Sequence, residues 1–236
     1  MQGTMTPGSA ATDTASGDLA GDIGRRLAAC RAQRGLRVAE LAREIGVTPS
    51  LISQIERGQS RPSVSTLFAL AQALEVPVDA FFREPAAASP AAPAGPALAP
   101  PAADRHQAES RYVVRRGSRA AIDIEGGVRW ERLTPDTMGH LDFFELVYGP
   151  GSESNPTLYS HPGTEMVLML TGRLDISAGF ETYRLEPGDS MQFPSSLPHR
   201  YANPDAAEAR AVTVIMYDCP TDGPGPAPAS RHPGAI

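Results

Sequence analysis

The polar residues between positions 48 and 62 have the types and spacing of a surface that reads nucleic acid. Ser50, Gln54 and Arg57 stand at i, i+4 and i+7, so a helix places them on one face. A Gln side chain can bond two atoms of an adenine edge, and an Arg that follows the helix suits phosphate. The opposite face of the same helix is apolar and carries Leu51, Ile52 and Ile55. This stretch therefore predicts a short helix that enters a DNA major groove.

Local signals mark both ends of this helix. Thr48 is a preferred N-cap residue, and Pro49 suits the first helical position, where the N–H that it lacks is not needed. Gly58 ends the helix, because glycine readily adopts the left-handed conformation that follows a last turn. These signals delimit a short helix with an apolar face that anchors it and a polar face that it presents.

Charge is distributed unevenly along the 236 residues. The formal net charge of −6 by itself argues against a nucleic-acid binder. Residues 19–84, however, hold nine Arg against seven acidic residues, whereas residues 111–219 hold ten Arg against fifteen acidic residues. Every basic residue is Arg, which we interpret first as a consequence of genome composition, although Arg also suits bidentate recognition. Contact with DNA must therefore come from the local placement of Arg in the first half of the chain.

Cysteine usage and hydropathy indicate a reducing compartment. Cys30 and Cys219 lie in different predicted domains without metal-type spacing, and Cys30 continues the apolar stripe of Ile23 and Leu27, so we expect a buried thiol. No stretch has the apolar length of a membrane span, and the N-terminus lacks a basic-then-apolar signal pattern. We expect a cytoplasmic protein without a membrane partner.

Composition divides the chain into two ordered domains. Sixteen of the nineteen residues in 85–103 are Pro or Ala, a composition that forms a semi-extended spacer and cannot pack a core. Both ends are poor in large apolar residues and predict disorder. The expected organisation is a disordered arm at 1–18, a helical domain at 19–84, a Pro/Ala-rich linker at 85–109, a second domain at 110–219 and a disordered tail at 220–236.

The hydrophobic period changes between the two domains. Before the linker it is 3.6 residues and predicts a bundle of about five helices: about 19–33, about 38–45, the helix after Thr48, one capped by Ser63, and a short one that ends at Phe82. After the linker it is 2 residues and predicts an all-β sandwich or barrel. The expected strands are Tyr112–Arg116, Ala120–Ile124, Val128–Leu133, Leu141–Tyr148, Glu165–Leu170, Arg173–Ser177, Thr182–Leu185, Ser190–Phe193 and Ala211–Tyr217. The fold class is therefore α+β with two domains.

Residues 19–84 resemble the helix-turn-helix domain of the phage-repressor-like regulators, the XRE family. The resemblance rests on Gly35-Leu36, Glu40-Leu41-Ala42, Ile45 to Thr48, Ile52 to Gly58 and Arg61-Pro62. It implies that the third helix lies in the major groove, that the second crosses the backbone, and that Arg31 and Glu56 form a buried ion pair. The alternative is an ordinary helical bundle with a polar face.

The resemblance also assigns roles to single residues. Pro49, Ser50 and Gln54 face bases, while Arg37, Arg57, Gln59 and Arg61 approach phosphates. The sequence departs from the common pattern at Pro49, which supplies no donor, and at Arg37, where a capping Ser or Thr is usual. Base readout therefore depends on Gln54 and Ser50. The expected DNA-binding residues are Arg37, Thr48, Pro49, Ser50, Ser53, Gln54, Arg57, Gln59 and Arg61.

Residues 159–203 resemble the two motifs of the cupin superfamily, which implies a double-stranded β-helix over about residues 110–218. The matching positions are His161, Glu165, Gly172, Pro187-Gly188-Asp189, Pro194, His199 and Asn203. In metal-binding cupins the first motif supplies two His and a Glu, and the second supplies one His. His161, Glu165 and His199 match three of these ligands, and Tyr159 stands where the first His would be.

Two imidazoles and one carboxylate can form a facial triad for iron(II), or hold zinc or manganese. The expected cofactor is therefore a divalent metal on His161, Glu165 and His199, and the same residues with Tyr159 are the expected ligand pocket. Other interpretations stay open. Tyr159 could bond an organic ligand or bind metal as phenolate, the two His could line a polar pocket only, and Glu165 could pair with Arg184 or Arg200.

Three histidines and the only tryptophan lie outside the two motif regions. His106, His140 and His232 lie outside the motifs and are expected in solvent. Trp130, the only tryptophan, lies on an expected strand and is either a core residue or an interface anchor.

A DNA-reading domain joined to a pocket is similar to the layout of XRE-type regulators with a C-terminal cupin sensor. This resemblance implies a homodimer that binds a double-stranded DNA operator and responds to a small-molecule effector or a metal, without enzymatic activity. A single helix-turn-helix reads only a half-site, so dimerisation is expected, most readily through the cupin sheet. One alternative is a non-haem iron(II) oxygenase or epoxidase with a remnant helix-turn-helix domain. Another is a metal-free cupin that serves only to dimerise.

Overall fold

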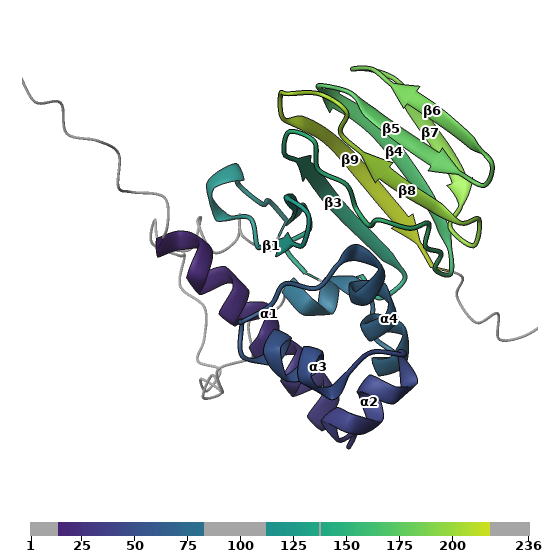
Figure 1. Cartoon of the computed structure of the whole chain (residues 1–236). Helices are drawn as coiled ribbons and strands as arrows, with labels where there is room; N and C mark the ends of the chain where they lie inside the picture. Colours follow the sequence, from purple (N-terminus) through teal and green to yellow (C-terminus); the bar gives the residue numbers. More distant parts are fainter. Residues whose placement is uncertain (1–13, 83–111, 137, 218–236) are drawn as a thin grey trace, which may run out of the picture.

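The computed structural model describes residues 14–82, 112–136 and 138–217. Within these ranges a helical bundle precedes an antiparallel β barrel, which confirms the expected two-domain α+β fold (Figure 1). The expected linker at 85–109 and tail at 220–236 lie outside the described residues, as do His106, Cys219 and His232. The expected arm at 1–18 also lies outside them, except for its last five residues, which belong to the first helix.

Four α-helices and a 3-10 helix make up the described part of the first domain. They are α1 (Thr14–Gln33), α2 (Val38–Glu44), α3 (Pro49–Glu56), α4 (Val64–Leu74) and η1 (Val78–Phe82). The expected fifth helix is thus a single short 3-10 segment of five residues. Helix α1 begins earlier than expected, since Gly17 and Gly21 lower its helix propensity and hide its first turns in the sequence.

Side-chain caps fix the positions of the helices around the DNA-reading segment. The Thr48 hydroxyl accepts a hydrogen bond from the backbone N–H of Leu51 at 3.2 Å, as expected for an N-cap. Ser63 does the same for α4 through the N–H of Thr66. At the start of α2 the Glu40 carboxylate accepts the backbone N–H of Arg37, so the glutamate half of a capping box satisfies this N–H.

Helices α1 and α3 approach so closely that only glycine fits between them. A Cβ atom on Gly24 would lie 2.5 Å from the carbonyl oxygens of Ile55 and Glu56. Beside this contact the Arg31 guanidinium donates two hydrogen bonds to the Glu56 carboxylate, at 2.6 and 3.0 Å. The structure therefore confirms the ion pair between the first and third helices. It fixes the rotation of α3, which has to present its polar face outward.

Nine strands in two sheets form the barrel within the described residues. The six-stranded sheet has the order β1-β2-β3-β9-β4-β7, the three-stranded sheet has the order β6-β5-β8, and all pairs are antiparallel. The strands are β1 (Ala121–Ile124), β2 (Val128–Arg132), β3 (Leu141–Tyr148), β4 (Thr164–Thr171), β5 (Leu174–Ala178), β6 (Glu181–Leu185), β7 (Ser190–Pro194), β8 (His199–Ala202) and β9 (Ala209–Met216).

Two of the strand predictions were wrong. Tyr112–Arg116 is not a strand, since the chain there runs as a loop into a 3-10 helix at Arg116–Ser118. Strand β8 was not expected, because it has only four residues and its inward residues are His199 and Tyr201 rather than aliphatic side chains. An apolar alternation therefore does not mark this strand in the sequence.

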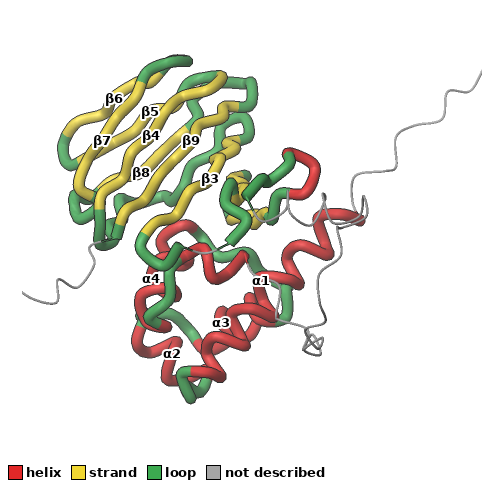
Figure 2. Tube along the Cα trace, turned by 180° about the vertical axis from the view of Figure 1, so that it is seen from behind, coloured by secondary structure: helices red, strands yellow, loops and turns green. Residues whose placement is uncertain are grey.

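The barrel rests on one side of the helical bundle. Helix α4 and η1 face the barrel, whereas α2 and α3 lie towards the far end of the bundle (Figures 1 and 2). The contacts between the domains include a hydrogen bond from Ser65 to Asn155 at 2.9 Å and stacked rings of Phe82 and Phe144 with centroids 4.9 Å apart. Helix α1 also packs against β1, and the Pro62 carbonyl accepts the backbone N–H of Glu125 at 3.0 Å, so these contacts together with α4 set how α3 is oriented relative to the barrel.

A buried carboxyl group lies in this domain interface. Asp142 accepts the backbone N–H of Asp79 at 3.3 Å and the hydroxyl of Tyr217 at 2.6 Å. Burial raises the pKa of Asp142 to about 6 against the effect of the Tyr217 hydrogen bond, and the negative charge of Asp79 raises it further. Because the pKa in the folded protein lies above the ordinary value, protonated Asp142 stabilises the fold at low pH, and this contribution is lost as the pH rises through about 6.

We therefore expect Asp142→Asn, which keeps the acceptor oxygen without the charge, to become more stable relative to the wild type as the pH rises from 4 to 7. The relative gain in the free energy of unfolding is up to about 3 kcal/mol, since one pKa unit corresponds to about 1.4 kcal/mol. Denaturant titrations at both pH values measure it, with the exposed Glu125→Gln as the control. A constant difference between wild type and Asp142→Asn across this range would contradict the assignment.

Candidate functional site

Helix α3 exposes the polar face that the sequence predicts. Ser50 and Gln54 are exposed, while Ile52 and Ile55 on the opposite face are fully buried in the bundle. Thr48 and Pro49 at its first turn are exposed as well, and Ser53 is half-buried. The helix therefore presents short polar side chains on a rigid, capped support, which is what contact with base edges requires.

The expected phosphate contacts separate into two groups. Arg57 and Gln59 follow α3 directly and are joined by a hydrogen bond of 3.0 Å, and Arg37 is exposed at the start of α2. Arg61 instead extends towards the barrel, where its guanidinium lies 3.7 Å from the carboxylate of Asp123 on β1. The structure thus brings most of the predicted residues to α3 and its ends, but it places Arg61 at the domain interface.

The barrel encloses the three predicted metal ligands. His161 precedes β4, Glu165 lies at the start of β4 and His199 begins β8, and the side chains are only 5%, 4% and 0% exposed. The Glu165 Oε2 atom lies 3.5 Å from Nε2 of His161 and 3.4 Å from Nε2 of His199. The ligand atoms of all three residues lie within 4.8 Å of one another.

Hydrogen bonds around the triad determine which atoms point inward. The Nδ1 atoms of His161 and His199 lie 3.2 and 2.8 Å from the carbonyl oxygens of Pro162 and Leu197. A carbonyl only accepts, so each Nδ1 carries the proton, and in the neutral imidazole Nε2 then holds a lone pair. The other oxygen of Glu165, Oε1, accepts the hydroxyls of Tyr201 and Thr213, whereas its Oε2 faces the two Nε2 atoms.

The charge states agree with this arrangement. Burial lowers the pKa of His199 below 6.5, so His199 is neutral at pH 7. Burial alone would raise the pKa of Glu165, but His161, His199 and the Tyr201 hydroxyl outweigh it and hold that pKa below 4.5. The site therefore places one carboxylate against two imidazoles, with Oε2 of Glu165 facing Nε2 of both.

These residues fit a divalent metal ion. Nε2 of His161, Nε2 of His199 and Oε2 of Glu165 are buried and have no hydrogen-bond partner among the described residues. Three converging electron-pair donors without a donor between them are stabilised by a cation, and two nitrogens with one carboxylate suit iron(II), zinc or manganese. The alternative pairings of Glu165 do not occur: Arg184 pairs with Asp175, and Arg200 pairs with Glu153.

Tyr159 lies beside the His161 and His199 rings of this site. Its ring packs against the His199 imidazole with centroids 4.6 Å apart, and its backbone forms a β-bridge with His199. Burial raises the pKa of Tyr159 well above 10, and the nearby Tyr148 and Glu165 add to the effect. The metal-free protein therefore keeps Tyr159 as a neutral phenol.

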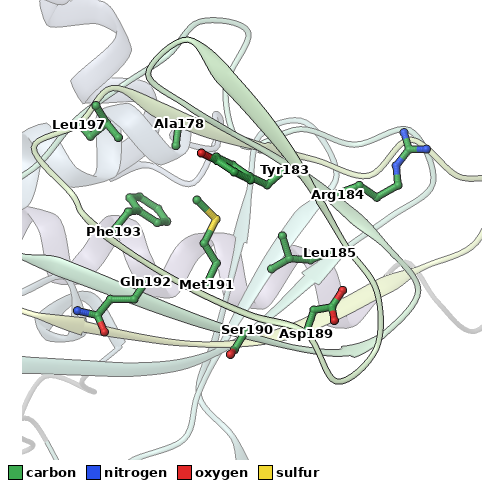
Figure 3. Close-up of a pocket in the computed structure, with 10 residues that line it drawn as sticks. All are labelled: Ala178, Tyr183, Arg184, Leu185, Asp189, Ser190, Met191, Gln192, Phe193 and Leu197. Atoms are coloured by element: carbon green, nitrogen blue, oxygen red, sulfur yellow. The ribbon is translucent and has the colours of Figure 1, made fainter.

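Beyond the triad, an open cavity of about 500 Å³ lies between β6 and β7. Figure 3 shows Tyr183, Leu185, Met191 and Phe193 gathered around it, whereas Arg184 points away. Phe193 separates the cavity from the triad, since its ring meets the His199 imidazole edge to face at 5.0 Å. Sequence reasoning missed this cavity. Its signal in the sequence is the apolar alternation on β6 (Tyr183 and Leu185) and on β7 (Met191 and Phe193).

The remaining candidates have structural positions. Trp130 is buried in the barrel and contacts Phe144, so it is a core residue and not an exposed interface anchor. Cys30 is a free, half-buried thiol whose pKa is raised by burial, and His140 is exposed, as expected. Within the described ranges, no helix has the length and apolar character needed to cross a membrane.

We expect Zn²⁺ to raise the melting temperature of the wild-type protein, because an ion that binds only the folded state adds about 2.7 kcal/mol at one hundred times its Kd. Glu165→Gln should abolish the rise, since an amide keeps the acceptor for Tyr201 and Thr213 but removes the anionic ligand. Calorimetry with and without Zn²⁺ measures both, and the exposed His140→Ala is the control. An equal rise in Glu165→Gln would place the ion elsewhere.

Both domains match known protein families. Residues 27–81 match the helix-turn-helix family HTH_3, and residues 144–215 match the family Cupin_2, described as a cupin domain. The HTH-type transcriptional regulator SutR of Escherichia coli (strain K12) is 24% identical over 200 residues, covering 85% of this chain and 97% of SutR. The HTH-type transcriptional regulator PuuR of the same organism is 26% identical over 191 residues, covering 81% and 92%.

A solved structure shows the same fold over most of the chain. It is an HTH_3 family transcriptional regulator from Vibrio cholerae, with a TM-score of 0.58 and 23% identity, covering 86% of this chain and 99% of that one. The helix-turn-helix match coincides with the helical bundle, and the cupin match that follows it along the chain coincides with the barrel. The chain therefore combines the two domains of an XRE-type helix-turn-helix transcriptional regulator with a C-terminal cupin domain.

Proposed function

We propose that this protein acts in the cytoplasm as a homodimer that binds a two-fold related DNA operator through α3 and responds to occupancy of its cupin barrel. The observation that carries the proposal is the pairing of an outward polar face on α3 with a buried His161–Glu165–His199 site in the same chain. The barrel takes a divalent metal, a small-molecule effector, or both. An effector that binds the DNA-competent and incompetent arrangements with different affinity shifts operator occupancy.

Readout of the operator depends on the exposed end of α3. Gln54 and Ser50 contact base edges, while Arg37, Arg57 and Gln59 hold the DNA backbone and make the affinity dependent on salt. The apolar face of α3, with Ile52 and Ile55, is fully buried, so the helix enters the groove as a rigid body. A helix of two turns reads few base pairs, and a second copy is needed for useful affinity.

We expect Gln54→Ala to weaken binding to the selected operator by about 1–3 kcal/mol, the value of a bidentate contact with an adenine edge. Selection of genomic fragments by both proteins at physiological salt would also show a relaxed base preference in the variant. Gln33→Ala, at the exposed end of α1, is the matched control and should leave the operator unchanged. Identical selected motifs for wild type and Gln54→Ala would remove Gln54 from the readout.

The outer face of the six-stranded sheet suits a dimer interface. The outward side chains of β3, β4 and β9 form rows in register, since Phe143 and Met166 both pair with Val214, and Leu168 pairs with Val212. Leu168 is 44% exposed, and Leu170 and Met216 are comparably exposed. An apolar sheet face of this kind is typical of a protein interface.

Charged residues at one side of this face favour a second copy of the same chain as the occupant. Arg119 and Arg210 form ion pairs with Glu131 and Glu145, so the margin carries both signs of charge in one network. In a two-fold dimer this charged network would face the same network of the second copy, so positive groups could lie opposite negative groups without net repulsion. The same axis would set two copies of α3 for symmetric half-sites.

We expect Leu168→Glu to convert the dimer into a monomer, because it places a charge in the centre of an apolar interface. Light scattering coupled to gel filtration measures the mass, and operator affinity should fall at least about tenfold when the second half-site is lost. Phe180→Glu, at a fully exposed hairpin tip, is the matched control and should remain dimeric. A dimeric Leu168→Glu would move the interface to another surface.

A non-haem iron oxygenase is the second candidate function, and the geometry of the triad is the observation that favours it. Two imidazoles and one carboxylate leave open positions on a bound iron(II). The exposed Gln54 face of α3 and the regulator relatives favour DNA binding without catalysis. Oxygen consumption by the iron-loaded protein with candidate substrates, together with failure to select any DNA motif, would reverse this assignment.

A further inference from the structure

Helix α4 inserts one aromatic side chain into the mouth of the barrel. The side of α4 that carries Leu67, Leu70 and Leu74 is buried in the helical bundle. Phe68 is outside this stripe, yet it is only 6% exposed, because the barrel covers it. The sequence contains a hint of this contact, since a large apolar residue off the core stripe of a helix requires a second partner.

The ring of Phe68 lies flat on a metal-ligand imidazole. Its centroid is 3.7 Å from that of His161, and the two ring planes differ by 8°. Trp130 meets the edge of Phe68 at 5.8 Å, and Tyr159 lies on another side at 6.1 Å. Phe68 is thus surrounded by the rings of Trp130, Tyr159 and His161. The Nε2 atom of the His161 ring faces Glu165.

Empty space lies between the two domains beside the Phe68–His161 contact. A cavity of about 230 Å³ borders both Phe68 and His161, and both domains line it. Gln72, Glu75 and Pro77 form the bundle side, while Pro162 and Tyr217 form the barrel side. The bond from Ser65 to Asn155 and the Phe82–Phe144 stack join the same two domains without contacting the triad. Phe68 is therefore the interface contact that touches the site itself.

The charge of the imidazole controls the strength of this stack. A cation bound at Nε2 withdraws electrons from the His161 ring and makes it more positive, and a positive group over an aromatic face within about 6 Å is attracted to it. We propose that Phe68 couples the two domains: a divalent cation on His161, Glu165 and His199 tightens the Phe68–His161 stack and thereby holds the DNA-binding domain docked on the barrel. By linkage, the docked Phe68 raises the affinity for the cation by the same factor.

The coupling rests on the proposed function of the triad as a cation site and adds its route to the DNA-binding domain. Because α4 shares the core of the bundle with α3, an occupied site that holds α4 on the barrel favours one arrangement of the recognition helix. Release of the cation weakens the stack and lets the bundle rotate away. No contact between the cation and the DNA-binding domain is needed.

The test uses the full chain and Zn²⁺ as the only ligand. Zn²⁺ affinity is measured by competition with a chromophoric chelator for the wild type, Phe68→Ala and Phe68→Leu. Phe68→Leu keeps most of the apolar volume and guards against simple unfolding, but it lacks the aromatic face. Phe82→Leu is the matched control, since it weakens an interdomain stack in which neither ring contacts a triad histidine. The single tryptophan, Trp130, reports docking through the protection of its fluorescence from acrylamide.

We expect Zn²⁺ affinity to fall about tenfold in Phe68→Ala and several-fold in Phe68→Leu, in line with the strength of a cation–π contact. Phe82→Leu should bind Zn²⁺ like the wild type. Zn²⁺ should increase the protection of Trp130 in the wild type and in Phe82→Leu but not in either Phe68 variant.

Equal Zn²⁺ affinity in the wild type and both Phe68 variants would overturn the coupling while leaving the cation site intact. An equal loss in Phe82→Leu would also overturn it, because general loosening of the interface would then explain the effect. Failure of the wild type to bind Zn²⁺, Fe²⁺ or Mn²⁺ at all would instead remove the cation from the proposed function, and the coupling with it. Operator selection would still decide the DNA-binding role separately.

Discussion

Nε2 of His161, Nε2 of His199 and Oε2 of Glu165 converge inside the barrel, and no group among the described residues donates a hydrogen bond to them. Neighbouring groups hold these three side chains in place. Tyr201 and Thr213 occupy one oxygen of Glu165, and backbone carbonyls occupy Nδ1 of each histidine. The remaining lone pairs face a common point. These three atoms lack hydrogen-bond partners among the described residues, so their burial costs free energy that a bound cation would offset. Buried ionisable groups that converge in this way are typical of a functional site.

Helix α4 packs against both domains. One side packs into the helical bundle, and the other side docks on the barrel through Phe68 and Ser65. A helix that is buried on both sides has little freedom to rotate independently of either neighbour. The bundle and the barrel therefore adjust as units, and their relative position is determined at a small interface that also includes the ionisable Asp142.

Local patterns predicted the parts of this protein that depend on local interactions. The cap at Thr48, the polar face with Gln54 and the His161–Glu165 pair are encoded within a few residues, and the structure places them as expected. Strand β8 was missed because its inward positions are polar. The Phe68–His161 stack and the cavity behind Phe193 depend on contacts between segments far apart in the chain. Periodicity within one element contains little information on such contacts.

The ion pair between Arg61 and Asp123 has a consequence for DNA recognition. We propose a phosphate-binding role for residues that flank α3, and in the docked arrangement the guanidinium of Arg61 already faces a carboxylate of its own chain. Asp123 also accepts a hydrogen bond from Arg129 at 3.0 Å, so its carboxylate lies between two arginines. In the proposed binding mode, an operator phosphate would have to displace this carboxylate to reach Arg61, and this arginine would then add less to the salt dependence of binding than a free one.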